Sequence, residues 1–417
     1  MARNRIPLWI ALPIIGVGAL VAFVMGLFAY MSLTATPLHQ DAQAIPSVWR
    51  SAPPDAWASA AERGRQAART ALVDQNLPGL SVAVGVAGDV VWAEGFGWAD
   101  LELRNPVTPE TRFRTGEVSK ALTSAAVGLL LEKNELQLDA EIQTYVPEFP
   151  KKEWRVTLRH LMGDVAGLRD DPGDEAPLAN VLDDDGLPNL RCDRTVDALK
   201  LFADGALRFE PGTRHHPSTY GWILVSAAVD AAASGQSFFT FMRAQVFEPL
   251  GMRSTRPDSA AEQVPERATF YFPRFAGDPR YGPDPAREGD HSCFAGGGAF
   301  LSTPSDLVRF GMGINSGTLL KAETVRLLQT PLRLTSGEET GYGLGWKLET
   351  LPLAGEAARM AGHGVKGDFI GGSAYLMTFP ERGLAVAVMT NISFADTKSI
   401  ALRLAESFAE QGSSPPN

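Results

Sequence analysis

The residues with the clearest chemical potential stand at the start of an apolar helical stretch, where the sequence reads Glu117-Val118-Ser119-Lys120. A lysine can take the proton of a serine hydroxyl that attacks an amide or ester, provided that both side chains share one helical face. Ser119 and Lys120 are consecutive, so their side chains point about 100° apart. Glu117 and Lys120 have the i, i+3 spacing of a helical ion pair. Within these four residues, Lys120 therefore has a carboxylate on its own face, while the hydroxyl of Ser119 lies on another face.

Histidines and aromatic residues are the other candidate groups. Glu117, His363 and one of His215 or His216 would supply two imidazoles and a carboxylate, a set that suits a divalent metal. The sequence has no HxH or HExxH spacing to support such a site, so we expect no metal and no other cofactor. Three tryptophans are candidates for stacking on a ligand or, more commonly, for the core: Trp92, Trp98 and Trp222.

The elements that would position these groups follow from hydrophobic periodicity. Alternating residues on both sides of Ala87-Gly88-Asp89 predict a hairpin over 80–102. Two further strands are expected at 372–379 and 384–390. Helices are expected at 55–72, 118–133, 220–233 and 396–410. Strands near both ends predict an α+β fold: one antiparallel sheet flanked by helices, with a mostly helical subdomain inserted at about 118–310.

Composition and charge narrow the class of protein. The 417 residues include 38 Lys and Arg against 48 Asp and Glu, which gives a net charge of −10. This balance argues against nucleic acid as a partner, because phosphate contacts need a basic face. A charged fraction of 21% and an aromatic fraction of 9% are typical of a globular chain. Two cysteines are too few for a zinc site built from cysteine alone.

The N-terminus predicts a membrane anchor. Residues 6–33 contain no charged side chain, and Arg3 and Arg5 precede them. About 20 apolar residues cross a bilayer, and the positive-inside rule then places the stub, residues 1–5, in the cytoplasm. We expect a single-pass protein of the cytoplasmic (inner) membrane, with a linker at 34–54, the domain at 55–412 on the periplasmic or outer face, and a tail at 413–417.

A cleavable signal peptide is the alternative, since Ala42-Gln43-Ala44 has the small-x-small form of a cleavage site. The apolar run is much longer than the roughly 7–15 residues of a signal peptide, which favours an uncleaved anchor. On the outer face, Cys192 and Cys293 would meet an oxidising compartment. The sequence leaves open whether they form a disulfide or remain two buried thiols.

Several stretches together resemble one known superfamily. They are LPGLSVAV at 77–84, FGWADLELRNPVTPETRFRTGEVSKALT at 96–123, LQLDAEIQTYVPEFP at 136–150, FEPGTRHHPSTYGWILVSAAVD at 209–230, CFAGGGAFLSTPSDLVRFG at 293–311 and GGSAYLMTFPERGLAVAVMTN at 371–391. In this order they resemble the serine β-lactamases and penicillin-binding proteins, on the class C β-lactamase and D-alanyl-D-alanine carboxypeptidase side. Within that superfamily the chain is most similar to the mitochondrial β-lactamase-like proteins and their bacterial relatives.

The resemblance implies a serine hydrolase that works through an acyl-enzyme, and it identifies where this chain departs from the pattern. Lys120 matches the lysine of the family's S-x-S-K motif, whereas Glu117 stands at the position of the nucleophilic serine. Pro217 stands where the family has the tyrosine of its second motif, and Thr219 ends that motif. His363 matches the first residue of the third motif, which here reads His363-Gly364-Val365.

Three altered motifs predict a pseudoenzyme whose serine acyl-transfer chemistry is lost or impaired. Two alternatives stay open: an active ester or peptide hydrolase with a non-standard nucleophile, and a self-assembling scaffold or ligand-binding protein. The partners expected are a peptide or cell-wall-like ligand in the old cleft, the membrane through the N-terminal helix, and a second copy of the chain in a homo-oligomer.

Overall fold

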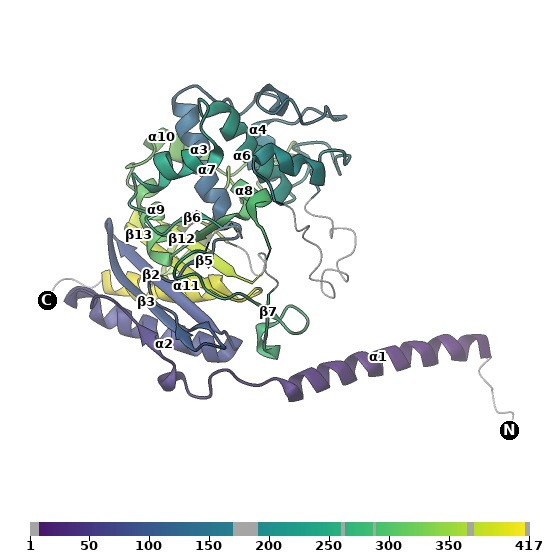
Figure 1. Ribbon diagram of the computed structural model, residues 1–417, viewed down its shortest axis with the longest axis vertical. Helices are drawn as coiled ribbons and strands as arrows, with labels where there is room; N and C mark the ends of the chain where they lie inside the picture. Colours follow the sequence, from purple (N-terminus) through teal and green to yellow (C-terminus); the bar gives the residue numbers. More distant parts are fainter. Residues whose placement is uncertain (1–7, 170–190, 260–262, 287–288, 365–370, 413–417) are drawn as a thin grey trace.

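An eight-stranded antiparallel sheet forms the centre of the fold (Figure 1). The computed structural model describes residues 8–169, 191–259, 263–286, 289–364 and 371–412. Seven strands follow the order β1-β3-β2-β13-β12-β11-β10, and β4 pairs with β3. Their bounds are β1 Ser47–Val48, β2 Gly79–Val86, β3 Asp89–Asp100, β4 Asn105–Pro106, β10 Lys347–Leu353, β11 Glu356–His363, β12 Ser373–Phe379 and β13 Leu384–Thr390.

The two ends of the domain meet in the pairing of β2 with β13, in which Leu80 lies opposite Thr390. Side chains on a strand alternate between the two faces of a sheet. Val386 and Val388 accordingly face one core, and Ala385 and Ala387 face the other. Because both faces are buried, these strands are apolar almost throughout. The prediction of one sheet assembled from both ends of the domain is confirmed.

Helices cover the sheet on both faces and confirm the α+β class (Figure 1). On one face α2 (Ala58–Gln75) packs against α11 (Thr397–Gly412), where Trp92 of β3 stacks on Phe408 at 5.9 Å between ring centroids. On the other face, α9 (Pro304–Asn315) contacts β2, β12 and β13, and a helical lobe lies beyond it. The remaining helices of that lobe are α3 Val118–Glu132, α4 Leu158–Met162, α6 Thr219–Ala232, α7 Phe238–Phe241, α8 Ala295–Gly298 and α10 Ala322–Leu328.

The inserted region also contains short strands. One three-stranded sheet has the order β5-β9-β6, and β7 pairs with β8 in a separate hairpin. A buried ion pair fixes the first of these sheets, with 2.7 Å between Arg114 Nε and Asp258 Oδ2. The bounds are β5 Phe113–Arg114, β6 Arg256–Pro257, β7 Tyr271–Pro273, β8 Pro283–Pro285 and β9 Phe300–Ser302.

Some boundaries differ from the sequence prediction. The first helix of the domain begins at Ala58, after a single 3-10 turn over Asp55–Trp57. Strands β10 and β11 were not among the predicted elements, because their exposed positions interrupt the apolar alternation. Part of the expected linker lies on the domain, since Ser47 pairs with Phe96.

The N-terminal helix α1 (Leu8–Thr34) extends away from the domain (Figure 1). Its 21-residue stretch Ile14–Thr34 is long and apolar enough to cross a membrane, and none of it is buried. These properties fit a membrane anchor or a signal sequence. The expected cytoplasmic stub, residues 1–5, and the tail, residues 413–417, lie outside the described residues.

The two cysteines of the chain, Cys192 and Cys293, form a disulfide across the helical lobe, with 4.9 Å between their Cα atoms. The alternative of two separate buried thiols is therefore wrong. The bond closes a loop of 101 residues. This loop contains α6, the helix that follows the second motif.

Candidate functional site

The chain enters α3 through a fixed turn that places Glu117 at the helix N-terminus. Thr115 bonds to Phe300 of β9 twice: its backbone N–H donates to the carbonyl at 2.9 Å, and its hydroxyl at 3.0 Å. Gly116 then takes a positive φ of 51°, a conformation that glycine adopts without strain. Glu117 follows as the N-cap residue of α3. The positive end of the helix dipole favours a carboxylate at this position.

Glu117 and Lys120 form the ion pair that their spacing predicts. Lys120 Nζ donates to Glu117 Oε1 at 3.0 Å, and it lies 3.6 Å from Asp164 Oδ2. The side chain of Lys120 is 1% exposed, that of Asp164 is 5% exposed and that of Glu117 is 14% exposed. Burial by itself raises the pKa of Glu117, but Lys120, with smaller contributions from His363 and Lys347, holds this pKa below its ordinary value.

Asp164 joins three segments of the site and was not among the residues singled out in the sequence. Its Oδ1 accepts hydrogen bonds from the Trp222 indole at 3.1 Å and from the backbone N–H of Ser218 at 3.3 Å. Its carbonyl accepts from the backbone N–H of His216 at 2.7 Å. Burial, with the nearby charge of Glu117, raises the pKa of Asp164 to about 6 against the opposing effect of Lys120.

Ser119 does not face Lys120. Its Oγ lies 2.7 Å from Thr115 Oγ1, and the whole residue is buried. This contact turns the hydroxyl toward the chain that leads into α3 from β5. The structure therefore places the only serine of the Glu117–Lys120 motif away from the lysine that would have to activate it.

The segment of the second motif leads into α6. Pro217 is exposed, and Ser218 caps the helix by accepting the backbone N–H of Gly221 at 3.2 Å. Thr219 is the first residue of α6. It borders Gly297, where an added Cβ would lie 3.0 Å from Thr219 Cγ2. Thr219 is thus held by close packing at the start of the helix.

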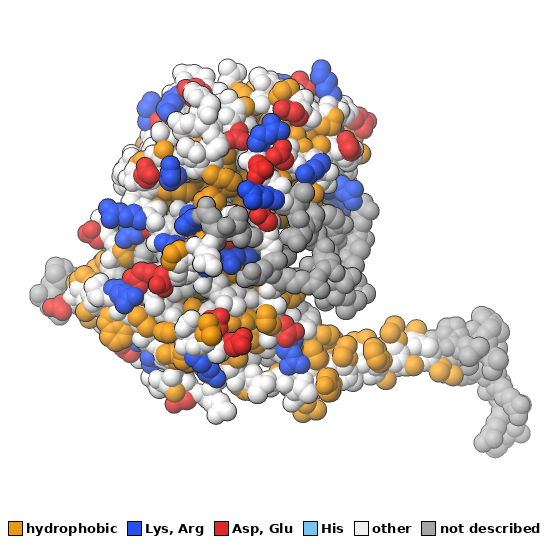
Figure 2. All heavy atoms as spheres, in the orientation of Figure 1, with side chains coloured by type: hydrophobic (Ala, Val, Ile, Leu, Met, Phe, Trp, Pro, Cys, Tyr) orange, Lys and Arg blue, Asp and Glu red, His pale blue; other side chains and the backbone are white. Residues whose placement is uncertain are grey.

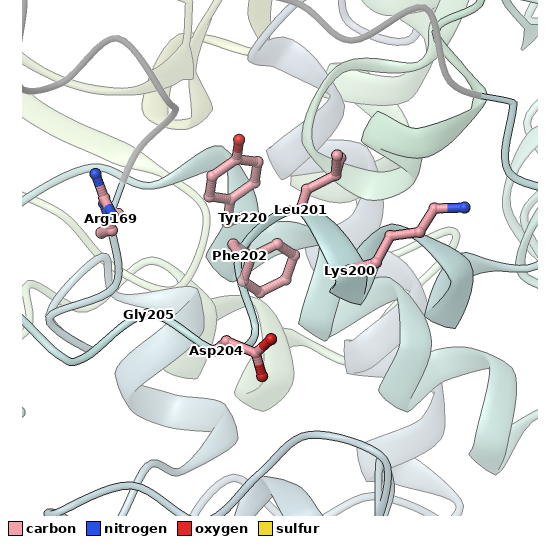
Figure 3. Close-up of a pocket in the computed structure, with 7 residues that line it drawn as sticks. All are labelled: Arg169, Lys200, Leu201, Phe202, Asp204, Gly205 and Tyr220. Carbon is pink, nitrogen blue, oxygen red and sulfur yellow. The ribbon is translucent and has the colours of Figure 1, made fainter.

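Tyr220 is close to Pro217 in sequence, but its ring belongs to another part of the lobe. It stacks on Phe202, with 4.6 Å between the ring centroids. Figure 3 shows the two rings side by side in a pocket of about 220 Å³ that Arg169, Lys200 and Asp204 also line. Tyr220 therefore does not supply the phenol that the resemblance would place at position 217.

His363, the candidate residue of the third motif, ends β11 and is buried. The backbone N–H of Gly364 donates to His363 Nδ1 at 2.9 Å, so the proton of the neutral ring is on Nε2. Burial lowers the pKa of His363 to about 3, although Glu117 acts in the opposite direction. The ring is therefore neutral at physiological pH.

Tyr342 is a phenol near this cluster that sequence reasoning missed. Burial raises the pKa of Tyr342. The carboxylates of Glu117 and Asp164 raise it too, while the ammonium groups of Lys347 and Lys120 lower it. The signal in the sequence is the glycine spacing of GYGLGW at 341–346. Gly345 has a φ of 86°, and an added Cβ there would lie 3.0 Å from the Lys120 carbonyl, so only glycine allows this segment to approach α3.

His215 stacks on Tyr342, with 4.4 Å between ring centroids. Burial, together with the charges of Lys120 and His216, lowers the pKa of His215 to about 4. Lys120 thus lies near three candidate residues from the sequence: Glu117, His215 and His363. The described residues contain no group of three or more His, Cys, Asp or Glu side chains that could hold a metal ion.

Of the tryptophans proposed for ligand stacking, Trp92 and Trp222 are buried in the core. Trp98 is partly exposed, and the Arg104 guanidinium lies 5.3 Å from its ring centroid. The aromatic candidates thus belong mainly to the packing of the sheet and of α6.

Comparison with known proteins identifies the class to which this fold and site belong. The beta-lactamase family matches residues 59–408, and the chain belongs to this family. The chain is similar to the serine beta-lactamase-like protein LACTB, mitochondrial, of Mus musculus, at 28% identity over 89% of this chain and 84% of that one. It is also similar to penicillin-binding protein 4* of Bacillus subtilis, at 25% identity over 75% of this chain and 67% of the relative.

Solved structures agree on the fold. The octameric penicillin-binding protein homologue from Pyrococcus abyssi superposes with a TM-score of 0.66 at 24% identity, covering 82% of this chain and 76% of that one. The penicillin-binding protein from Bacillus halodurans superposes with a TM-score of 0.64 at 22% identity, covering 80% of this chain and 96% of that one. The β-lactamase and penicillin-binding-protein fold predicted from the sequence motifs is confirmed.

Proposed function

We propose that this protein is a membrane-anchored member of the beta-lactamase family that has lost serine acyl transfer. The observation that carries the proposal is the ion pair at the start of α3, where Glu117 stands 3.0 Å from Lys120. The residue in the place of the family's nucleophilic serine is thus a carboxylate held by the lysine that would activate a hydroxyl. Acylation of a carboxylate would give an anhydride, a more reactive species than the ester that a serine gives.

The state of Lys120 supports this proposal. A lysine can accept a proton only as a neutral amine. Carboxylates at 3.0 Å and 3.6 Å favour the ammonium form. The hydroxyl of Ser119 lies against Thr115, so Ser119 does not replace the missing serine.

The second motif supports the same conclusion. Pro217 offers no group that can transfer a proton, and the ring of Tyr220 packs on Phe202. We propose that the site binds a peptide or cell-wall-like ligand without turnover. Polar groups that such a ligand could reach include Glu117 and Lys347, whose side chains are 14% and 29% exposed.

The length and composition of α1 support an uncleaved anchor that holds the domain on the outer face of the cytoplasmic membrane. The Cys192–Cys293 disulfide favours the same side, because such bonds persist in oxidising compartments.

Reaction with a fluorescent penicillin and a fluorophosphonate, read on the full-length protein, tests the loss of chemistry. We expect no covalent label on the wild-type chain or on Ser119→Ala. Labelling of the wild type that Ser119→Ala abolishes would overturn the proposal and would favour a hydrolase with a non-standard nucleophile.

A gain-of-function variant sharpens the test. Glu117→Ser places a hydroxyl three residues before Lys120, and Pro217→Tyr restores a phenol on a segment that Asp164 fixes through His216 and Ser218. The double variant should acquire esterase activity toward p-nitrophenyl acetate at least tenfold above the wild type. Glu135→Ser, at an exposed position after α3, is the matched control and should show none.

A further inference from the structure

The loop at the end of the β7–β8 hairpin, residues 274–282, lies against α1. Phe28 of α1 packs edge-on against Phe275, with 4.9 Å between ring centroids, and lies 6.4 Å from Tyr281. Phe275 and Tyr281 also contact each other at 5.5 Å. Three rings from segments about 250 residues apart thus form one aromatic cluster, which joins the helix to the domain.

The hairpin that carries this loop is attached to the end of the central sheet. The backbone N–H of Tyr271 donates to the Asn391 carbonyl at 2.9 Å, and its hydroxyl accepts the N–H of Leu101 at 2.8 Å. At the tip, Gly277 lies against the ring of Phe394, 3.4 Å from the position of an added Cβ. The loop is therefore fixed to the domain, and its position relative to α1 is a property of the fold.

The position of Phe28 along α1 gives the depth of the loop. At 1.5 Å per residue, the helix rises roughly 30 Å from its first residue, Leu8, to Phe28, which is about the thickness of the hydrocarbon core. Phe28 would then stand at the outer boundary of that core, with Tyr30 just beyond it. Tyrosine and tryptophan are enriched at this level of a membrane.

We propose that the loop 274–282 rests in the outer headgroup layer of the bilayer, beside the exit of α1. This inference depends on the proposed anchor and adds a second membrane contact to it. Phe275 and Tyr281 supply an aromatic surface at this boundary. Figure 2 shows hydrophobic side chains running along α1 up to the edge of the domain where the helix meets it.

A depth measurement on the full-length protein tests this contact. Arg274→Cys and, as a control, Leu327→Cys on α10 each add one exposed thiol, while both native cysteines are held in the disulfide. Each variant is labelled with the fluorophore NBD and reconstituted into vesicles of phosphatidylcholine and phosphatidylglycerol with a nitroxide on the headgroup. We expect at least threefold stronger quenching at position 274 than at position 327.

The outcomes separate the two proposals. If the chain floats with the vesicles and positions 274 and 327 are quenched equally, the loop contact is wrong and the anchor stands. If the intact chain does not float with vesicles, both are wrong. In a Phe275→Ser/Tyr281→Ser background, quenching at position 274 should fall at least twofold while flotation is unchanged; undiminished quenching would overturn the role of the two rings.

Discussion

Lys120 Nζ lies 3.0 Å from Glu117 Oε1 at the start of α3, with 1% of the lysine side chain exposed. The other described carboxylate at this ammonium is Asp164, 3.6 Å away. A buried ammonium needs such partners, because an isolated charge in a protein interior is strongly disfavoured. Glu117 therefore stabilises a lysine that the fold still buries, and this role explains a carboxylate at a helix start without any appeal to catalysis.

Breaking this pair should be costly. Lys120→Met should lower the free energy of unfolding by about 3 to 5 kcal/mol, because it leaves the carboxylates of Glu117 and Asp164 without the ammonium they share. Glu117→Gln should cost less than Lys120→Met, because Asp164 still lies 3.6 Å from the ammonium. Urea denaturation of the two variants and of the double variant measures the coupling, and the double variant should lose less than the sum of the two. The exposed pair Arg50–Glu110 is the matched control, and Glu110→Gln should cost less than about 1 kcal/mol. Equal costs at the two sites would contradict this account.

His363 should make the protein sensitive to acid. Its pKa is about 3 in the folded state because of burial, against 6.5 for an unperturbed histidine. As the pH falls below 6.5 the unfolded chain binds a proton and the folded chain does not, so stability is lost. His363→Asn keeps an acceptor for the Gly364 N–H. Between pH 6.5 and pH 4 the wild type should lose roughly 3 kcal/mol more of its free energy of unfolding than this variant does. Urea unfolding at several pH values measures the difference; parallel curves would be evidence against a buried neutral imidazole.

Asp164 should have the opposite effect. Burial raises its pKa from 3.8 to about 6, so between these values the folded chain holds a proton that the unfolded chain has released. Its contribution therefore becomes less favourable as the pH rises from about 4 to about 6. In Asp164→Asn this dependence should disappear, while the amide oxygen still accepts from Trp222. The free energies of unfolding of both proteins across this range provide the test, and an unchanged slope would contradict the raised pKa.

The disulfide should be a large contribution to stability. Cys192 and Cys293 are separated by 101 residues, and a loop of this length corresponds to about 4 to 5 kcal/mol in the chain-entropy description. Cys192→Ser/Cys293→Ser should lower the free energy of unfolding by about 2 to 5 kcal/mol. A reductant should do the same to the wild type and leave the variant unchanged. If neither the double substitution nor the reductant lowers the free energy of unfolding, the bond contributes little.

The sequence predicts the parts of this site that depend on local spacing. The i, i+3 relation of Glu117 and Lys120 is enough to predict their ion pair. Asp164 and Tyr342 are different, because tertiary contacts bring them to the site. Asp164 reaches Lys120 through a turn with a φ of 54°, and Tyr342 reaches it through a glycine-rich segment that crosses close to α3. Neither position can be predicted from the hydrophobic periods of 2 residues in a strand and 3.6 residues in a helix.

The same distinction holds for the fold. The apolar strands β2 and β13 are read directly from sequence because both of their faces are buried. In β10 every position before Leu353 is partly or fully exposed, and three of the first four residues of β11 are exposed. Tertiary pairing therefore defines these strands.

The pairing of β2 with β13 also sets the order of events when the chain is made. Leu80 lies beside Thr390, so the middle of the sheet stays open until more than nine-tenths of the chain has left the ribosome. A domain of this topology cannot close stepwise from its N-terminus, because contacts so distant in sequence form late. If α1 enters the membrane first, as the proposed anchor requires, this delay would keep the rest of the chain unfolded while it crosses. The central sheet would then close only after its last strand has crossed.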